Sequence, residues 1–140
     1  MDAISETLKA TGVQAELLGE DQRNAFVAKL RSGLGVDVSS WAPWNDANAP
    51  DGMQRGDGWE LIPQFVGSSA CLMFIAGART IWRLNNGSDL LEVLNECSPL
   101  EFYVCDDDAR YLLCSNHHDS LIGWGETLDW VDGLVHMPGI

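Results

Sequence analysis

The segment from Glu101 to Gly125, EFYVCDDDARYLLCSNHHDSLIGWG, constrains the fold of this chain more than any other part of its sequence. Two runs rich in aromatic and aliphatic residues flank three consecutive aspartates, and two such runs joined by a short polar turn are typical of a β-hairpin. A third apolar run follows the polar sequence SNHHD. The segment therefore predicts three strands, EFYVCD, RYLLCSN and SLIGW, the first two joined by Asp107, Asp108 and Ala109.

Four helices are predicted elsewhere from the spacing of apolar residues, acidic first turns and terminal glycines. The first two cover residues 3–10, ending near Gly12, and residues 20–32, stopped by Gly33. The third lies in NNGSDLLEVLNECSP, capped by Ser88 and ending before Pro99. The fourth is a short helix within GETLDWVDGLV. These four helices and the strands predict a mixed fold rather than an all-β one.

Residues 59–66, 71–76 and 79–84 are rich in β-branched and aromatic residues and are separated by short Gly- and Ser-containing turns, which predicts an antiparallel meander. Pro63 indicates an edge strand or a bulge in the first of these runs. Residues 34–58 read as a long loop in which Trp41 and Trp44 either pin the chain to the core or anchor a partner. The fold class is α+β: amino-terminal helices, then an antiparallel sheet of about five or six strands interrupted by one helix.

The length of 140 residues and the hydrophobic content of 46% predict one globular domain over residues 1–140. A chain of this size buries on the order of 68% of its unfolded surface, which suffices for a core without disulfides or metals. The longest uncharged apolar stretch, residues 65–78, falls short of the roughly 20 residues that a membrane helix needs. The amino terminus MDAISETLKA lacks the features of a secretory signal, so we expect a cytoplasmic protein.

The charge balance narrows the choice of partner. The chain has 21 acidic and 8 basic residues, a net charge of −13. A protein that binds phosphate backbones or anionic lipid needs Lys and Arg to place against them, so we expect neither nucleic acid nor membrane as a partner. The last 40 residues hold eight acids and one base, Arg110. This acidity predicts either a solubility role or complementarity to a basic protein.

The side chains able to carry chemistry gather at Cys114, His117, His118 and Asp119. They could ligate a metal ion, or supply a thiol nucleophile with an imidazole base, so a small metal-dependent or thiol enzyme is one alternative. The favoured interpretation is a turn in which Asn116 and Asp119 bond to backbone amides. The cysteines contain no CxxC pair and no nucleotide-binding or hydrolase motif occurs, so we predict no metal and no cofactor.

The stretch FYVCDDDARYLLCSNHHDSLIGWGE resembles the Tyr-Leu-Leu-x-x-Asn-His-His-Asp element of small acidic bacterial proteins, some of which look like immunity proteins encoded beside secreted toxins. The resemblance implies a non-enzymatic immunity or inhibitor protein that neutralises a basic partner, such as a cognate nuclease toxin. A protein-interaction adaptor is a further alternative. The candidate partner-binding residues are Trp41, Trp44, Asp106, Asp107, Asp108, His117, His118 and Asp119.

Overall fold

The computed structural model describes residues 3–39, 49–50, 52–75, 77–96, 101–116 and 119–134. Within these ranges the chain forms five helices and seven strands. In chain order they are α1 (Ala3–Thr11), β1 (Ala15–Leu17), α2 (Glu20–Leu34), β2 (Met53–Gln54), α3 (Gly58–Val66), β3 (Cys71–Phe74), β4 (Trp82–Leu84), α4 (Gly87–Glu96), β5 (Phe102–Cys105), β6 (Tyr111–Ser115), β7 (Ser120–Gly125) and α5 (Thr127–Gly133). The mixture of helices with an antiparallel sheet confirms the α+β class, although the sheet has seven strands rather than five or six.

The strands form one antiparallel sheet in the order β1-β4-β3-β5-β6-β7-β2. The three strands predicted between residues 101 and 125 are confirmed, as is the hairpin predicted for the first two: Val104 pairs with Leu113 across β5 and β6, and Leu113 pairs with Gly123 across β6 and β7. The meander predicted over residues 59–84 is confirmed only for its last two runs, which form the antiparallel pair β3 and β4. Two short strands that the sequence did not reveal, β1 and β2, lie at the two edges of the sheet. The second of these lies inside the predicted long loop.

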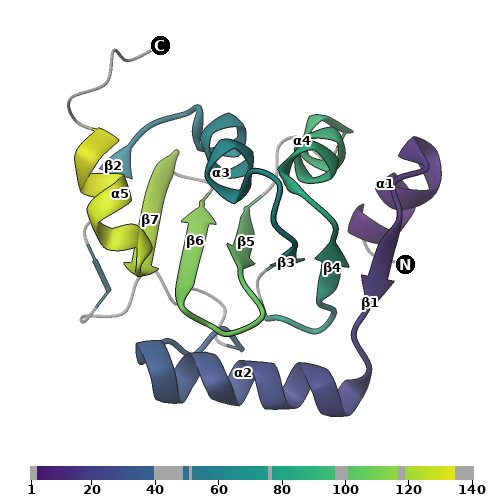
Figure 1. Cartoon of the computed structure of the whole chain (residues 1–140), viewed down its shortest axis with the longest axis horizontal. Coiled ribbons are helices and arrows are strands. Elements are labelled where there is room, and N and C mark those ends of the chain that lie inside the picture. The colour runs from purple at the N-terminus through teal and green to yellow at the C-terminus, as the bar shows by residue number, and fades with distance from the viewer. Residues whose placement is uncertain are drawn as a thin grey trace.

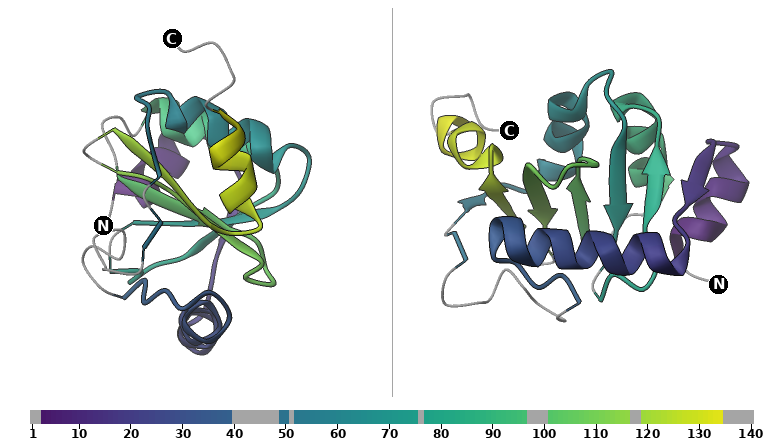
Figure 2. Two further views of the ribbon diagram at one scale, coloured as in Figure 1. Left: turned by 90° about the vertical axis from the view of Figure 1, so that its left-hand side faces the viewer. Right: turned by 60° about the horizontal axis from the view of Figure 1, so that its bottom comes forward.

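The two faces of the sheet are covered unequally (Figures 1 and 2). Helices α1, α3, α4 and α5 pack on one face, where strand residues such as Met73 and Val104 point. Helix α2 crosses the other face, toward which Leu72 and Cys105 point, and it buries only Phe26 and Leu30 of its 15 residues. No helix in the described part of the chain combines the length and the apolar composition needed to cross a bilayer. We call the four-helix side of the sheet the helical layer.

The prediction of a strand over residues 59–66 is wrong, because this segment forms helix α3. Its buried residues Leu61, Ile62 and Val66 recur with the helical period rather than the alternation of a half-buried strand. Pro63 marks neither an edge strand nor a bulge but lies buried inside the helix. The β-branched and aromatic composition of the run is explained by burial against the sheet and not by strand geometry.

Two predicted helix boundaries also move. Helix α4 begins earlier than predicted: the Asn86 side chain, rather than that of Ser88, accepts the backbone N–H of Asp89 at 2.8 Å. This is the contact expected of an asparagine N-cap. Helix α2 continues past Gly33 to Leu34, and its C-cap is Gly35, whose φ of 72° is the left-handed conformation that favours glycine. Gly12 ends α1 in the same conformation, as predicted.

Candidate functional site

The tip of the β5–β6 hairpin holds the three consecutive aspartates, and the first of them closes the turn. The nearly buried Asp106 carboxylate accepts the backbone N–H of Arg110 at 2.8 Å and its Nε–H at 2.6 Å. The Ala109 N–H donates to the Asp106 carbonyl at 3.3 Å, and Ala109 has a φ of 55°. Asp106 is therefore committed to the architecture of the hairpin, while Arg110 lies on its exposed surface.

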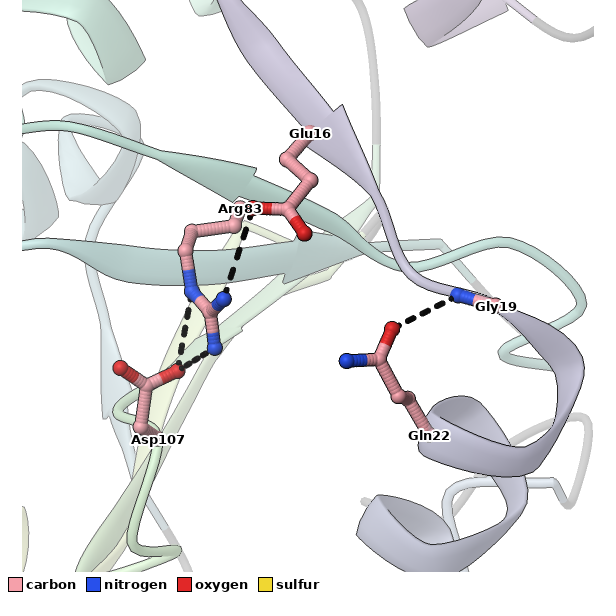
Figure 3. Close-up of polar contacts among 5 residues, drawn as sticks. All are labelled: Glu16, Gly19, Gln22, Arg83 and Asp107. Atoms are coloured by element: carbon pink, nitrogen blue, oxygen red, sulfur yellow. Dashed lines mark hydrogen bonds and ion pairs between the residues drawn. The ribbon is translucent and has the colours of Figure 1, made fainter.

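Asp107 is held by an arginine from a strand two places away in the sheet. Arg83 on β4 donates from Nη2 and Nε to Asp107 Oδ1 at 2.5 and 3.2 Å, and its Nη1 lies 3.6 Å from Glu16 Oε2 on β1 (Figure 3). The hydrogen bond that Arg83 donates to the Asp107 carboxylate is the main cause that raises the pKa of Arg83. The exposed Asp108, by contrast, forms no ion pair among the residues that the structure describes. It is the aspartate of the tip most accessible to a partner.

A hollow of about 230 Å³ separates this ion pair from helix α2. Figure 3 shows Gln22 on α2 across from Arg83 and Asp107, with its Oε1 accepting the Gly19 N–H at 3.0 Å. Apolar Leu18, Phe26 and Leu72 and the Lys29 side chain also line the hollow. Small-molecule pockets typically exceed about 300 Å³. The hollow therefore has room for one side chain rather than for a metabolite.

The residues of the SNHHD segment that lie between β6 and β7 and that the structure describes are Asn116 and Asp119. Buried Asn116 accepts the Ser120 N–H on its side-chain oxygen at 3.0 Å, and its backbone carbonyl accepts the Asp119 N–H at 3.1 Å. The turn interpretation is thus confirmed for Asn116. Asp119 is exposed with a φ of 58°, and its carbonyl, rather than its carboxylate, accepts a backbone amide, that of Arg55 at 2.8 Å. His117 and His118 lie outside the described residues.

A buried ion pair next to this turn was missed by the sequence reasoning. The Arg55 guanidinium donates to both oxygens of Asp57 at 2.8 and 2.9 Å, and both side chains are 9% exposed. Arg55 also donates to the carbonyl of Leu134 at 3.4 Å, just after α5. The hydrogen bonds from Arg55 lower the pKa of Asp57. The pair therefore joins α3, α5 and the β6–β7 turn, and the R-x-D spacing was its only sequence signal.

The structure separates the candidate residues that the sequence grouped together. The Asp106–Asp108 tip and the Asn116–Ser120 turn lie at opposite ends of β6, whose five residues span roughly 15 Å. One compact site cannot contain both. Trp41 and Trp44 lie outside the described residues, so their assignment to core or interface stays a prediction.

Burial argues against Cys114 as a nucleophile. Its side chain is fully buried on the α2 face of the sheet, and burial raises the pKa of the thiol well above its ordinary value. Burial likewise raises the pKa of Cys105, and that of Cys71 to about 12. A thiol reacts through its thiolate, which these surroundings disfavour. The described cysteines therefore act as small apolar core residues. Among the residues that the structure describes, no group of three or more His, Cys, Asp or Glu side chains is placed to hold a metal ion.

Among the described helices, those of the helical layer carry an excess of acidic over basic residues and α2 does not. Helices α1, α3, α4 and α5 carry seven acidic residues and one basic residue, Lys9, whereas α2 carries two acidic and three basic residues. The seven acids are Glu6, Glu60, Asp89, Glu92, Glu96, Asp129 and Asp132. Six of them are exposed and Asp89 is half-buried, and none forms an ion pair with a described basic residue. The sequence alone did not reveal this difference, because the acids come from helices far apart in the chain.

Comparison with other proteins adds no constraint to this geometry: the chain matches no family model, no curated protein and no solved structure.

Proposed function

We propose that this chain is a non-enzymatic immunity or inhibitor protein of a bacterial cell, and that it binds and neutralises a basic protein partner. The partner that best fits the YLLxxNHHD resemblance is a cognate toxin, such as a nuclease, whose substrate-binding surface is itself basic. The proposed action is occlusion: the acidic protein covers the surface that the toxin would use to bind its phosphate-bearing substrate.

The observation that carries this proposal is the difference in net charge between the helices on the two sides of the sheet. The helices of the helical layer have a net formal charge of −6, and α2 on the opposite face has +1. The difference arises because α2 offsets its two acids with three bases, whereas the seven acids of the helical layer have only Lys9 beside them. Repulsion among acids on one face costs stability, so we take their accumulation there as functional. A one-sided field orients a basic partner during encounter and accelerates association.

The hairpin tip has a secondary place in this proposal. Two of its three aspartates already have arginine partners within the chain, Asp106 with Arg110 and Asp107 with Arg83. A partner would have to compete with those arginines, whereas Asp108 is available without competition. We therefore place the main contact on the helical layer and treat Asp108 as a peripheral contributor.

The test uses the product of the neighbouring gene as the candidate toxin, expressed alone and together with this chain. Rescue of growth and a 1:1 complex in calorimetry are the expected results. Stopped-flow association at low and high salt then compares two matched variants and one single change. The helical-layer variant is Glu92→Gln with Glu96→Gln, the α2 control is Glu20→Gln with Asp21→Asn, and the tip variant is Asp108→Asn.

We expect the helical-layer variant to associate roughly threefold more slowly at low salt, since steering fields raise association rates by about 10 to 10³ in total. The α2 control should remain within experimental error of the wild type, and the difference between the two should vanish at high salt. Equal slowing of both variants would assign the effect to net charge and refute the helical layer as the interface. Absence of both rescue and complex formation would refute the proposed function itself.

A further inference from the structure

A second hollow lies between helix α5, strand β7 and the residues Pro50 and Gly52, near the β2 edge of the sheet. Its volume is about 230 Å³, and it is lined by Pro50, Gly52, Gly123, Leu128, Val131 and Asp132. Within the described chain only Leu17 and Leu128 are large apolar side chains that remain exposed. One of the two exposed large apolar residues is therefore found at the wall of this hollow.

The chemistry of the walls is that of a site for a long cationic side chain. Leu128 and Pro50 offer apolar surface, Val131 lines the hollow but is itself buried, and Asp132 supplies a carboxylate at the same place. Lysine and arginine combine an aliphatic stem, which packs on apolar surface, with a charged head that seeks a carboxylate. A guanidinium is more weakly hydrated than an ammonium and can bind a carboxylate through two hydrogen bonds, so arginine suits such a place better than lysine.

None of the described residues that line the hollow is basic. Arg55 and Arg110 are the described arginines nearest in sequence to these walls, and each is already bound, to Asp57 and Asp106 respectively. The exposed Asp129 adds a second carboxylate on the same helix. The hollow therefore combines a partly apolar wall with a carboxylate that has no basic side chain beside it among the described lining residues.

We infer that this hollow is an anchor site for one arginine side chain of a partner protein: the stem would pack on Leu128 and Pro50, and the guanidinium would bind Asp132. That the arginine belongs to a basic toxin rests on the proposed function. Whether the hollow binds an arginine side chain is a separate question, because that binding can be measured without the toxin. The negative field of the helical layer attracts a basic partner at long range. The anchor site would add one specific contact that sets the orientation of the bound partner.

The test is an NMR titration of the uniformly ¹⁵N-labelled chain with N-acetylarginine amide. N-acetylcitrulline amide, which has nearly the same shape without the charge, is the ligand control. We expect arginine-dependent shifts at the amides of Gly52, Gly123 and Asp132 and much smaller ones on α4. The variants are Asp132→Asn and Leu128→Ser, with Glu92→Gln on α4 as the matched control, and all three should melt within a few degrees of the wild type because the changed side chains are exposed.

Loss of one exposed ion pair corresponds to about a two- to fivefold weaker Kd in Asp132→Asn, and Glu92→Gln should leave the Kd unchanged. Equal shifts over all acidic helices, equal binding of the citrulline ligand, or equal effects of the two charge variants would overturn the inference. If arginine binds the hollow but the toxin is not neutralised, the proposed function fails and the hollow stands. If Asp132→Asn neutralises the toxin with unchanged affinity, the toxin does not use the anchor.

Discussion

Replacement of Gly87 by alanine tests the packing of the helical layer most directly. Gly87 is buried at the first position of α4, and its N–H donates to the carbonyl of Gly67 at 2.7 Å. A Cβ built on Gly87 would overlap the carbonyl oxygen of Pro63 and would lie 3.1 Å from both the nitrogen and the oxygen of Gly67. All three atoms belong to the backbone, so no side chain can rotate away to make room.

The expected cost follows from that geometry. Extra methyl groups in a well-packed core cost about 1–3 kcal/mol when side chains can shift. Here α3 and α4 must move apart, so we expect the alanine variant to lose about 3 kcal/mol of folding free energy, the upper end of that range. For a domain of this length each kcal/mol lowers Tm by roughly 3–4 °C, which predicts a decrease of roughly 10 °C.

Gly33→Ala is the matched control. Gly33 lies inside α2, is exposed, and a Cβ there would meet nothing within 4 Å. Alanine should therefore stabilise the chain by about 0.5–1 kcal/mol through helix propensity and reduced unfolded-state entropy. Urea unfolding followed by circular dichroism measures both. A Gly87→Ala variant as stable as the wild type would show that α3 and α4 do not approach as closely as described, and the account of that contact would be refuted.

Three further predictions follow from the site. Asp106→Asn should destabilise the chain by about 1 kcal/mol or more, because it weakens the bonds that close the hairpin, whereas Asp108→Asn should not; equal urea midpoints would contradict this. The lowered pKa of Asp57 means that its ion pair stabilises the fold fully above about pH 4 and less as the pH falls below it, so the difference in urea midpoint between wild type and Asp57→Asn should shrink from pH 5 to pH 2. The buried thiols should resist Ellman's reagent in the native protein and react in urea, and rapid native labelling of more than one thiol would be inconsistent with their burial. These thiols are Cys71, Cys105 and Cys114.

The elements that the sequence predicted correctly are those whose signals are local. The β5–β6–β7 meander has alternating or continuous apolar runs separated by polar turns, and α1 and α2 have periodic apolar residues ended by nearby glycines. The run 59–66 was misassigned because short apolar runs are compatible with either a buried helix or a strand. β1 and β2 could not be found, because strands of three and two residues carry no periodicity and depend on partners far away in the chain.

The site shows the same limit. The turn role of Asn116 could be predicted because its hydrogen-bond partner is four residues away. The partners of the Arg83–Asp107 ion pair are 24 residues apart in sequence and those of the Arg55–Leu134 contact are 79 apart. Neither contact could therefore be predicted from a local sequence pattern. The three aspartates and SNHHD were placed among the same candidate residues because they are close in sequence. A single strand between them is enough to place them at opposite ends of the sheet.

The strand order also has a consequence for how this chain acquires its fold. The β5–β6–β7 meander needs contacts only within residues 102–125, whereas β1 pairs with a strand more than sixty residues further along. Closing so long a loop costs more entropy than forming a hairpin, so the meander should form early and the two edges should be completed last. Until then the apolar centre of the sheet would present open edges on both sides. The short strands β1 and β2 therefore pair last and cover the edges of the sheet. Before they pair, the chain is most prone to aggregation through those open edges.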